Sequence, residues 1–143
     1  MLFQRKQKTN KKERLKGVNM YKSEVVYCEK ELTKKEQVML KDMSDTLSID
    51  KLTKENGLLI DVDFVAVIKI HNDRIDGDNK EYEKMVFVDK NGDRYTSGSE
   101  SLMRAYTDIA EEMKDSNEPW SIKVIRKESK NYNGGTFLTC VIV

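Results

Sequence analysis

The stretch "VFVDKNGDRYTSGSESLMRAYTDIAEEM", residues 86–113, carries the signals that decide the fold. It begins with a β-rich run, and Asn91-Gly92 predicts a two-residue type I′ hairpin turn, because Asn and Gly tolerate the positive φ that both central positions need. After the second strand, Ser97 or Ser99 can cap a helix that carries one apolar stripe. The stretch therefore predicts strand, turn, strand and helix in that order.

Residues 89–100 of this stretch also fit the spacing of a calcium-binding EF-hand loop. An EF hand needs glycine at the sixth position of that loop, where this chain has Arg94. The preceding segment "KMVFV" is typical of a strand, whereas an EF hand needs a helix there. The sequence therefore favours the hairpin. Its oxygen-bearing residues are then turn and cap residues: Asp89, Asn91, Asp93, Tyr95, Ser97 and Glu100.

The patterns outside this stretch predict four more strands and one more helix. The helix begins at Thr33, where Thr33 and Glu36 form a capping box. Strands are expected where β-branched and aromatic residues are enriched or alternate with polar ones. Their ranges are 20–32, 58–70, 120–128 and 136–143, with polar loops at 71–81 and 129–135.

From residue 57 onward, the predicted order is strand, hairpin, helix and two strands. This is the order of a five-stranded OB-fold barrel with its helix between the third and fourth strands. We therefore expect a mostly β protein with helices, in which a small closed barrel covers about residues 57–143. This barrel belongs to a single domain, 18–143, with an N-terminal strand and helix as an extension. OB folds bind oligonucleotides on strands two and three and through two of their loops.

The quoted stretch, followed by "PWSIKVIRKESKNYNGGTFLTCVIV" at residues 119–143, resembles the single-stranded DNA-binding proteins of Gram-positive phages and conjugative plasmids. It is similar in particular to the PrgE type of OB-fold protein. The resemblance covers about residues 57–143 and lies in element order and texture. It implies a non-enzymatic protein that binds single-stranded DNA largely without sequence preference, uses no cofactor, and leaves double-stranded DNA open as a second ligand.

Composition limits the setting in which the protein works. The chain has 143 residues, of which 36% are charged and 38% hydrophobic, as expected of one folded domain. No apolar run approaches the roughly 20 residues that span a membrane, and "MLFQRKQK" is not a secretory signal. Cys28 and Cys140 are expected to be reduced thiols. These features predict a cytoplasmic protein that does not bind membranes.

The first 17 residues form a predicted flexible basic arm. They carry seven basic residues and one acidic residue, a net charge of +6, whereas the rest of the chain has a net charge of −5. The arm can follow DNA as a polycation, it can dock its apolar tip on a neighbouring subunit and cause self-association, or it can be a tail without a role. The tip is Leu2 and Phe3, and the basic residues assigned to the arm's function are Arg5, Lys6, Lys8, Lys11 and Lys12.

Rings that stack on bases and cations that contact phosphates hold single strands without sequence preference. With Asn91-Gly92 as the turn, Phe87 lies opposite Thr96, and Phe87 and Arg94 share the outer face of the hairpin. Val86 and Val88 are then interior. If the faces are reversed, Phe87 belongs to the core.

The other predicted nucleic-acid contacts lie on neighbouring strands and a loop. Alternation over residues 120–128 directs Lys123 and Lys127 outward, with Arg126 near the strand end. The loop at 129–135 presents Lys130 and Tyr132. Tyr82 and Lys84 are weaker candidates.

Two other functions stay open. The chain has a single histidine, His71, and neither a G-x-S-x-G nor a Walker-type sequence, so we expect no catalytic site. A metal-dependent nuclease would have to use carboxylates from one strand and the following loop: Asp61, Asp63, Asp73, Asp76 and Asp78. We expect no bound metal. A protein-interaction module is the other alternative, because the body of the chain is acidic.

Overall fold

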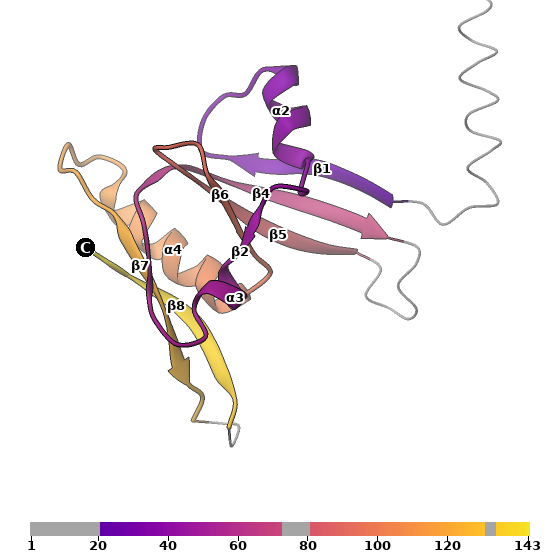
Figure 1. Cartoon of the computed structure of the whole chain (residues 1–143). Helices are drawn as coiled ribbons and strands as arrows, with labels where there is room; N and C mark the ends of the chain where they lie inside the picture. The colour runs from indigo at the N-terminus through magenta and orange to yellow at the C-terminus, as the bar shows by residue number, and fades with distance from the viewer. Residues whose placement is uncertain (1–20, 73–80, 131–133) are drawn as a thin grey trace, which may run out of the picture.

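The structure of the chain is a computed structural model that describes residues 21–72, 81–130 and 134–143. This part is mostly β, with two sheets and three helices (Figure 1). The predicted β-rich class is confirmed. Eight of the predicted functional residues lie outside the described residues: Leu2, Phe3, Arg5, Lys6, Lys8, Lys11, Lys12 and Tyr132.

The larger sheet has five strands in the order β1-β4-β5-β6-β2. Neighbouring strands in this sheet are antiparallel, except that β2 and β6 are parallel. The predicted N-terminal strand is confirmed as β1, which lies at one edge beside β4. The strands are β1 (Tyr21–Cys28), β2 (Leu47–Ser48), β4 (Val62–Asn72), β5 (Glu81–Asp89) and β6 (Arg94–Ser97).

The smaller sheet has three antiparallel strands in the order β3-β7-β8, namely β3 (Leu58–Ile60), β7 (Ile122–Glu128) and β8 (Thr136–Ile142). Only Asp61 separates β3 from β4, so one segment runs from one sheet into the other. The strand expected over 58–70 is therefore divided. The Asp61 side chain accepts a hydrogen bond from Ser121 at 2.8 Å and lies 3.4 Å from the Lys90 ammonium.

Two of the three helices begin where the sequence predicts. Helix α2 (Lys34–Lys41) has its complete capping box, in which Thr33 and Glu36 each accept a hydrogen bond from the other's backbone N–H at 3.1 Å. Helix α4 (Glu100–Met113) is capped by Ser99, which accepts from Leu102 N at 3.2 Å. The short α3 (Ile49–Leu52) is an element that we did not predict.

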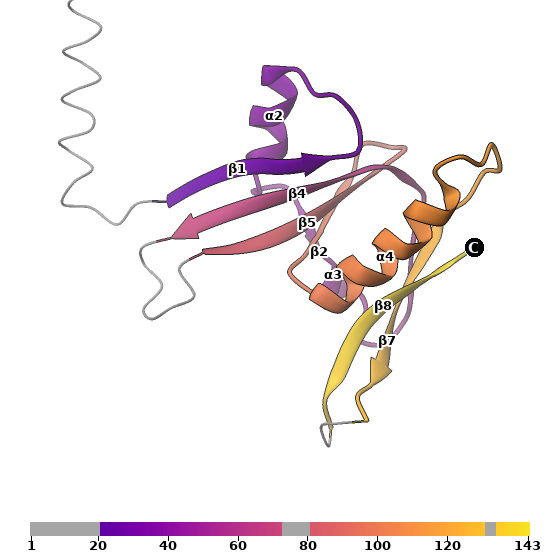
Figure 2. The same ribbon diagram turned by 180° about the vertical axis from the view of Figure 1, so that it is seen from behind.

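Buried side chains form two clusters on opposite faces of β4 and β5. One cluster joins the five-stranded sheet to α4 and the smaller sheet, and it includes Phe87, Leu102 and Ile122. The other lies under α2 and includes Leu40, Ala66 and Val86. Figures 1 and 2 show α2 and α4 on different sides of the larger sheet. The central strands therefore separate two apolar cores.

The described strands do not form the closed barrel that the sequence predicts. The far edge of β6 pairs with β2 and not with β8. The start of α4 lies against β8, where Ser101 Oγ donates a hydrogen bond to the Leu138 carbonyl at 2.6 Å. The two sheets are therefore connected through the β3–β4 segment and remain separate between β6 and β8.

The β5–β6 hairpin forms with a different turn from the predicted one. Gly92 N donates to Asp89 O at 3.0 Å, which makes Lys90 and Asn91 the central residues of the turn. Gly92 follows with φ 88°, and no described non-glycine residue has positive φ, which excludes type I′. The register therefore differs by one residue, and Phe87 lies opposite Tyr95 instead of Thr96.

Candidate nucleic-acid interface

The predicted contact pair on the β5–β6 hairpin is wrong. Phe87 is 0% exposed and packs edge-on against Tyr106, with 5.2 Å between the ring centroids. Arg94 lies on the opposite face of the sheet, since it is opposite Val88 in the register. Because both faces of β5 are covered at this point, neither side chain forms an exposed ring-and-cation site.

Arg94 has a structural role at the end of α2. Its Nη1 donates hydrogen bonds to the carbonyl oxygens of Met39 at 2.6 Å and Asp42 at 2.8 Å. Carbonyl groups at a helix C-terminus lack intrahelical partners and carry a partial negative charge, so a guanidinium stabilises them. Arg94 therefore attaches α2 to the sheet.

Tyr82 and Lys84 occupy the same face of β5 as Val86 and Val88, the face under α2. Both side chains are half-buried, and Tyr82 packs against the apolar cluster on that face. They lie on the larger sheet, whereas Lys123 and Lys127 lie on the smaller one. The structure does not bring these two predicted groups together.

The smaller sheet presents an exposed face that combines lysines with apolar side chains. Lys123 and Lys127 are exposed, as the alternation predicts. Phe137 lies directly opposite Lys127 on β8, and its side chain is 38% exposed. We call the side chains that share this side of the sheet the outer face. It consists of Leu59, Lys123, Ile125, Lys127, Phe137, Thr139 and Val141.

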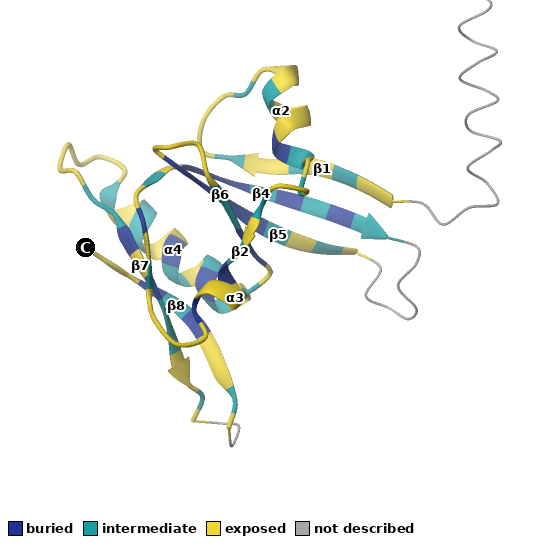
Figure 3. Ribbon diagram, in the orientation of Figure 1, coloured by how far each residue is buried: buried dark blue, intermediate teal, exposed yellow. Residues whose placement is uncertain are grey.

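Strand alternation builds the outer face by fixing the opposite side of the same strands in the core. Ile122 and Val124 are 0% exposed and Leu138 is 2% exposed, because they pack against α4 and the larger sheet. Their odd-numbered neighbours on β7 and β8 must then point away from the core. Figure 3 shows exposed residues on the far part of the β7–β8 hairpin. The alternation in 136–142 could have identified Phe137, which our sequence interpretation missed.

The outer face is basic. None of its seven members is acidic, and neither Lys123 nor Lys127 forms an ion pair within the described part of the chain. Lysines without a carboxylate partner are available to phosphates, and a partly exposed ring is available to a base. The outer face therefore has both kinds of group that unpaired nucleic acid requires.

Two other predicted cations near this hairpin differ in their availability. Arg126 points to the inner side, where it donates to Thr136 Oγ1 at 2.9 Å and lies 3.2 Å from the Asp50 carboxylate. It attaches α3 to β7 through Asp50, so its guanidinium already has partners within the described part of the chain. Lys130, at the start of the loop after β7, is exposed. Its loop partner in the prediction, Tyr132, lies outside the described residues.

Tyr106 is the core residue whose pKa departs furthest from its ordinary value. Its hydroxyl donates to the Glu29 carboxylate, at 2.9 and 3.0 Å from the two oxygens. Burial, and secondarily the Glu29 charge, raise the pKa of Tyr106 far above its ordinary value. The neutral phenol joins α4 to the residue that follows β1, which is a structural role.

The described residues do not assemble a nuclease centre. Within them, no three His, Cys, Asp or Glu side chains are placed to hold a metal ion together. Asp61 is hydrogen-bonded to Ser121, and this hydrogen bond together with the Lys90 charge lowers the pKa of its carboxyl. Asp73, Asp76 and Asp78 lie outside the described residues.

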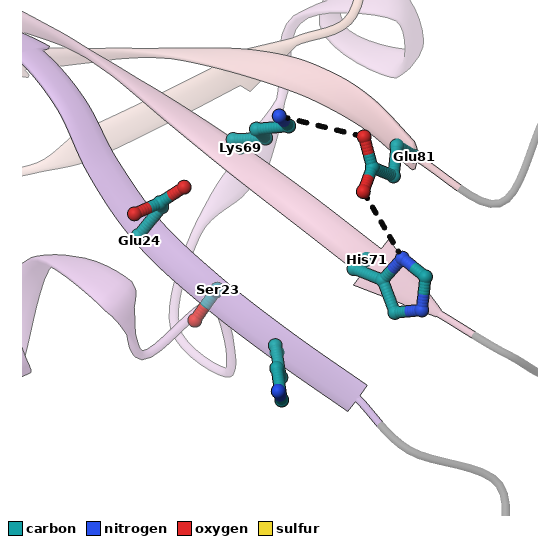
Figure 4. A pocket seen from close by; sticks show the side chains of 6 residues that line it. Ser23, Glu24, Lys69, His71 and Glu81 are labelled. Carbon is teal, nitrogen blue, oxygen red and sulfur yellow. Dashed lines mark ion pairs between the residues drawn. The ribbon is translucent and has the colours of Figure 1, made fainter.

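His71 belongs to a cluster of charged side chains at the end of β4. Its Nδ1 lies 3.4 Å from Glu81, which also lies 3.4 Å from the Lys69 ammonium (Figure 4). These residues line a shallow hollow with three residues of β1: Lys22, Ser23 and Glu24. The Lys69–Glu81 ion pair and the His71–Glu81 contact are of the kind expected on the exposed surface of a sheet.

None of the helices in the described part of the chain has the length and apolar composition of a membrane crossing. No protein-family model, curated protein or solved structure matches the chain. The likeness to plasmid and phage DNA-binding proteins therefore stays a prediction from the sequence.

Proposed function

We propose that the protein binds single-stranded DNA without catalysing a reaction on it, and that the outer face of the smaller sheet is the contact surface. The observation that supports this function is the position of Phe137 beside Lys127 on a face that carries a second lysine and no carboxylate. A base can stack on the ring while the ammonium groups contact the flanking phosphates. Neither contact reads base identity, so the expected binding is largely independent of sequence.

The strand order supports an OB-type architecture for this proposal. The β3–β4 segment serves as the first strand, since it pairs with β5 in one sheet and with β7 in the other. Strands β5 and β6, helix α4, and strands β7 and β8 follow in the order of an OB fold. The arrangement is that of a partly open barrel in which α4 and β2 occupy the edges that β6 and β8 would otherwise share.

The proposed surface differs from the usual OB surface for a physical reason. OB folds commonly bind on their second and third strands, which correspond here to β5 and β6. In this chain α2 and the second apolar core cover one side of β5, and α4 covers the other. Strands β7 and β8, which correspond to the fourth and fifth OB strands, keep one exposed side. The loop between them carries the predicted residues Lys130 and Tyr132.

The energetics favour moderate affinity that depends on salt. A stacked ring contributes about 1–3 kcal/mol per base, and each phosphate contact steepens the fall of log affinity with log salt by about 0.7. The outer face supplies one described ring and two lysines, so the basic arm of residues 1–17 is the natural source of further phosphate contacts. The proposal also includes self-association through the arm. It further includes a role for the protein in a phage or a conjugative element.

Fluorescence anisotropy with labelled oligo-dT tests the function. We expect binding that weakens with salt and leaves the oligonucleotide intact with and without Mg²⁺. Replacing both lysines, Lys123→Gln with Lys127→Gln, should reduce the salt slope by about 1.4, which is two contacts at about 0.7 each. The control, Lys34→Gln with Lys35→Gln, removes the same charge from exposed positions on α2 and should leave the slope unchanged.

Each outcome of this titration separates one function from the others. Cleavage in Mg²⁺ would support the nuclease. If the two double variants lose the same slope, the outer face is not the contact surface. A second function, docking of another protein, is favoured by the apolar members of the face, since Leu59 is 63% exposed and Val141 is 41% exposed. Absence of oligonucleotide binding would support that second function.

A further inference from the structure

Strand β1 is an edge of the larger sheet, and its outer side has no partner strand within the described residues. It also carries exposed apolar side chains, with Tyr21 55% exposed and Tyr27 57% exposed. An open edge presents backbone N–H and C=O groups that can pair with another strand. Natural proteins usually protect such an edge or use it.

A β-bulge divides β1 into two parts. Residues 21–25 pair with β4 in a regular antiparallel register, from Tyr21 opposite Asn72 to Val25 opposite Ile68. The register then shifts between Val25 and Tyr27. Bulges bend a strand and disturb its ladder, so only the first five residues offer a flat edge.

The sequence of these five residues is complementary to itself in one antiparallel register. When two copies of β1 pair about a two-fold axis perpendicular to the sheet, each residue must meet a residue that points to the same face. The axis must therefore pass midway between the two copies of one residue, which lie opposite each other. With the axis at Ser23, Lys22 of each copy lies opposite Glu24 of the other, and two opposite-charge pairs form. On the other face, Tyr21 then lies opposite Val25, an aromatic and β-branched pair of the kind that stabilises sheets.

The neighbouring registers are unfavourable. An axis at Lys22 places the two Lys22 ammonium groups opposite each other, and an axis at Glu24 places the two Glu24 carboxylates opposite each other. Like charges directly opposite in a sheet are destabilising. Among these three registers, the charges of this edge therefore favour the one centred on Ser23.

The alternation of opposite charges in this pairing continues across the neighbouring strands of the sheet. Glu24 lies opposite Lys69 of β4, and Lys69 lies opposite Glu83 of β5. Figure 4 shows Glu24 and Ser23 on β1 beside the cluster of Lys69, Glu81 and His71. In the Ser23 register, Lys22 of the second copy extends this row, so that Glu24 lies between two lysines. Neither Lys22 nor Glu24 forms an ion pair within the described residues of one chain.

We propose that two copies of this chain associate through their β1 edges, antiparallel and centred on Ser23, so that the two larger sheets become one continuous sheet. This surface lies on the other sheet from the outer face, and it goes beyond DNA binding. A ladder of five residues is short for a stable dimer, so the association is weak in dilute solution and increases with protein concentration.

Charge reversal tests the register. In Lys22→Glu, both cross-copy pairs become two carboxylates, and in Glu24→Lys they become two ammonium groups. Sedimentation velocity over a series of protein concentrations should show each variant associating about tenfold more weakly than the wild type. An equimolar mixture of the two variants should associate like the wild type, because a mixed pair restores both opposite-charge contacts.

The mixture is the decisive arm, since each chain in it carries the same internal charge change as in the separate samples. Circular dichroism of each variant confirms that the fold is retained. The double variant, Lys22→Glu with Glu24→Lys, should also recover the association. A wild type that is monomeric at every concentration, single variants that associate normally, or a mixture no stronger than its components would each overturn the proposed pairing.

Discussion

Two phenylalanines allow the fold of this protein and its proposed function to be tested separately. Phe87 is 0% exposed in the cluster that joins the two sheets, whereas Phe137 is 38% exposed on the outer face. Replacing each by alanine removes the same atoms from different surroundings. We expect Phe87→Ala to reduce stability and Phe137→Ala to reduce binding of oligo-dT.

The magnitudes follow from burial. Truncating a buried phenylalanine costs about 3–5 kcal/mol, and Phe87 also loses its edge-on contact with Tyr106 at 5.2 Å between centroids. For a domain of this size, such a loss corresponds to a Tm lower by about 10–20 °C. Phe137 contributes less to the core, so its truncation should change the free energy of unfolding by about 1 kcal/mol or less. The loss of one stacking contact should weaken binding about 5- to 150-fold.

The assay is urea unfolding followed by circular dichroism, together with anisotropy of labelled oligo-dT under conditions in which each variant is folded. If Phe87→Ala does not fold, Phe87→Leu retains part of the packing and should still be clearly destabilised. A Phe87 variant of normal stability would refute the assigned burial. A Phe137→Ala protein that binds oligo-dT like the wild type would refute the stacking role.

Three further predictions concern α2 and the thiols. Because a hydrogen bond from the backbone of Thr33 lowers the pKa of Glu36, the ionised carboxylate stabilises the fold above its ordinary pKa, and this contribution is lost as the pH falls through the lowered pKa. Glu36→Gln should therefore be less stable than the wild type at neutral pH and equal to it in acid, as measured by urea unfolding at both pH values. Arg94→Ala should cost about 1–3 kcal/mol of stability, because it leaves the last turn of α2 without two hydrogen bonds to a charged group; an Arg94→Ala midpoint in urea that matches the wild type would contradict this role. Burial raises the pKa of the Cys140 thiol to about 11, so a thiol reagent at mildly alkaline pH should modify half-buried Cys28 first and Cys140 only when the protein is unfolded, as mass spectrometry of the labelled peptides can show.

Local patterns predicted the elements that depend on neighbouring residues. The capping box at Thr33 and the cap of α4 need only a few consecutive side chains, and both are present. Alternation over residues 120–128 correctly exposes Lys123 and Lys127, because one side of β7 is firmly in the core. The same alternation applied to 136–142 would have added Phe137.

The hairpin register shows where local patterns are insufficient. Asn91-Gly92 fits two turns that differ by one residue in loop length, and the choice decides which side chains share a face. Asp89 contributes to the observed choice, since its carboxylate accepts hydrogen bonds from the backbone N–H groups of Asn91 and Asp93, both at 2.9 Å. That contribution becomes visible only when the turn is formed.

The face that Phe87 occupies depends on parts of the chain that are distant in sequence. Val86 is covered from the side of α2, while Phe87 packs against α4, so both members of an alternating pair are buried. A strand pattern cannot indicate a second covering layer that comes from residues 34–41. The short α3 was missed because four residues give too little periodicity to recognise.

The position of β4 and β5 between two apolar cores has a consequence for backbone dynamics. Their central amide groups are shielded on both sides of the sheet and on both edges by neighbouring strands. Solvent deuterium can reach those amides only when the whole domain unfolds, whereas the outer amides of β1 exchange from the native state. The slowest-exchanging amides of the molecule should therefore follow one hairpin, and their protection should equal the global stability.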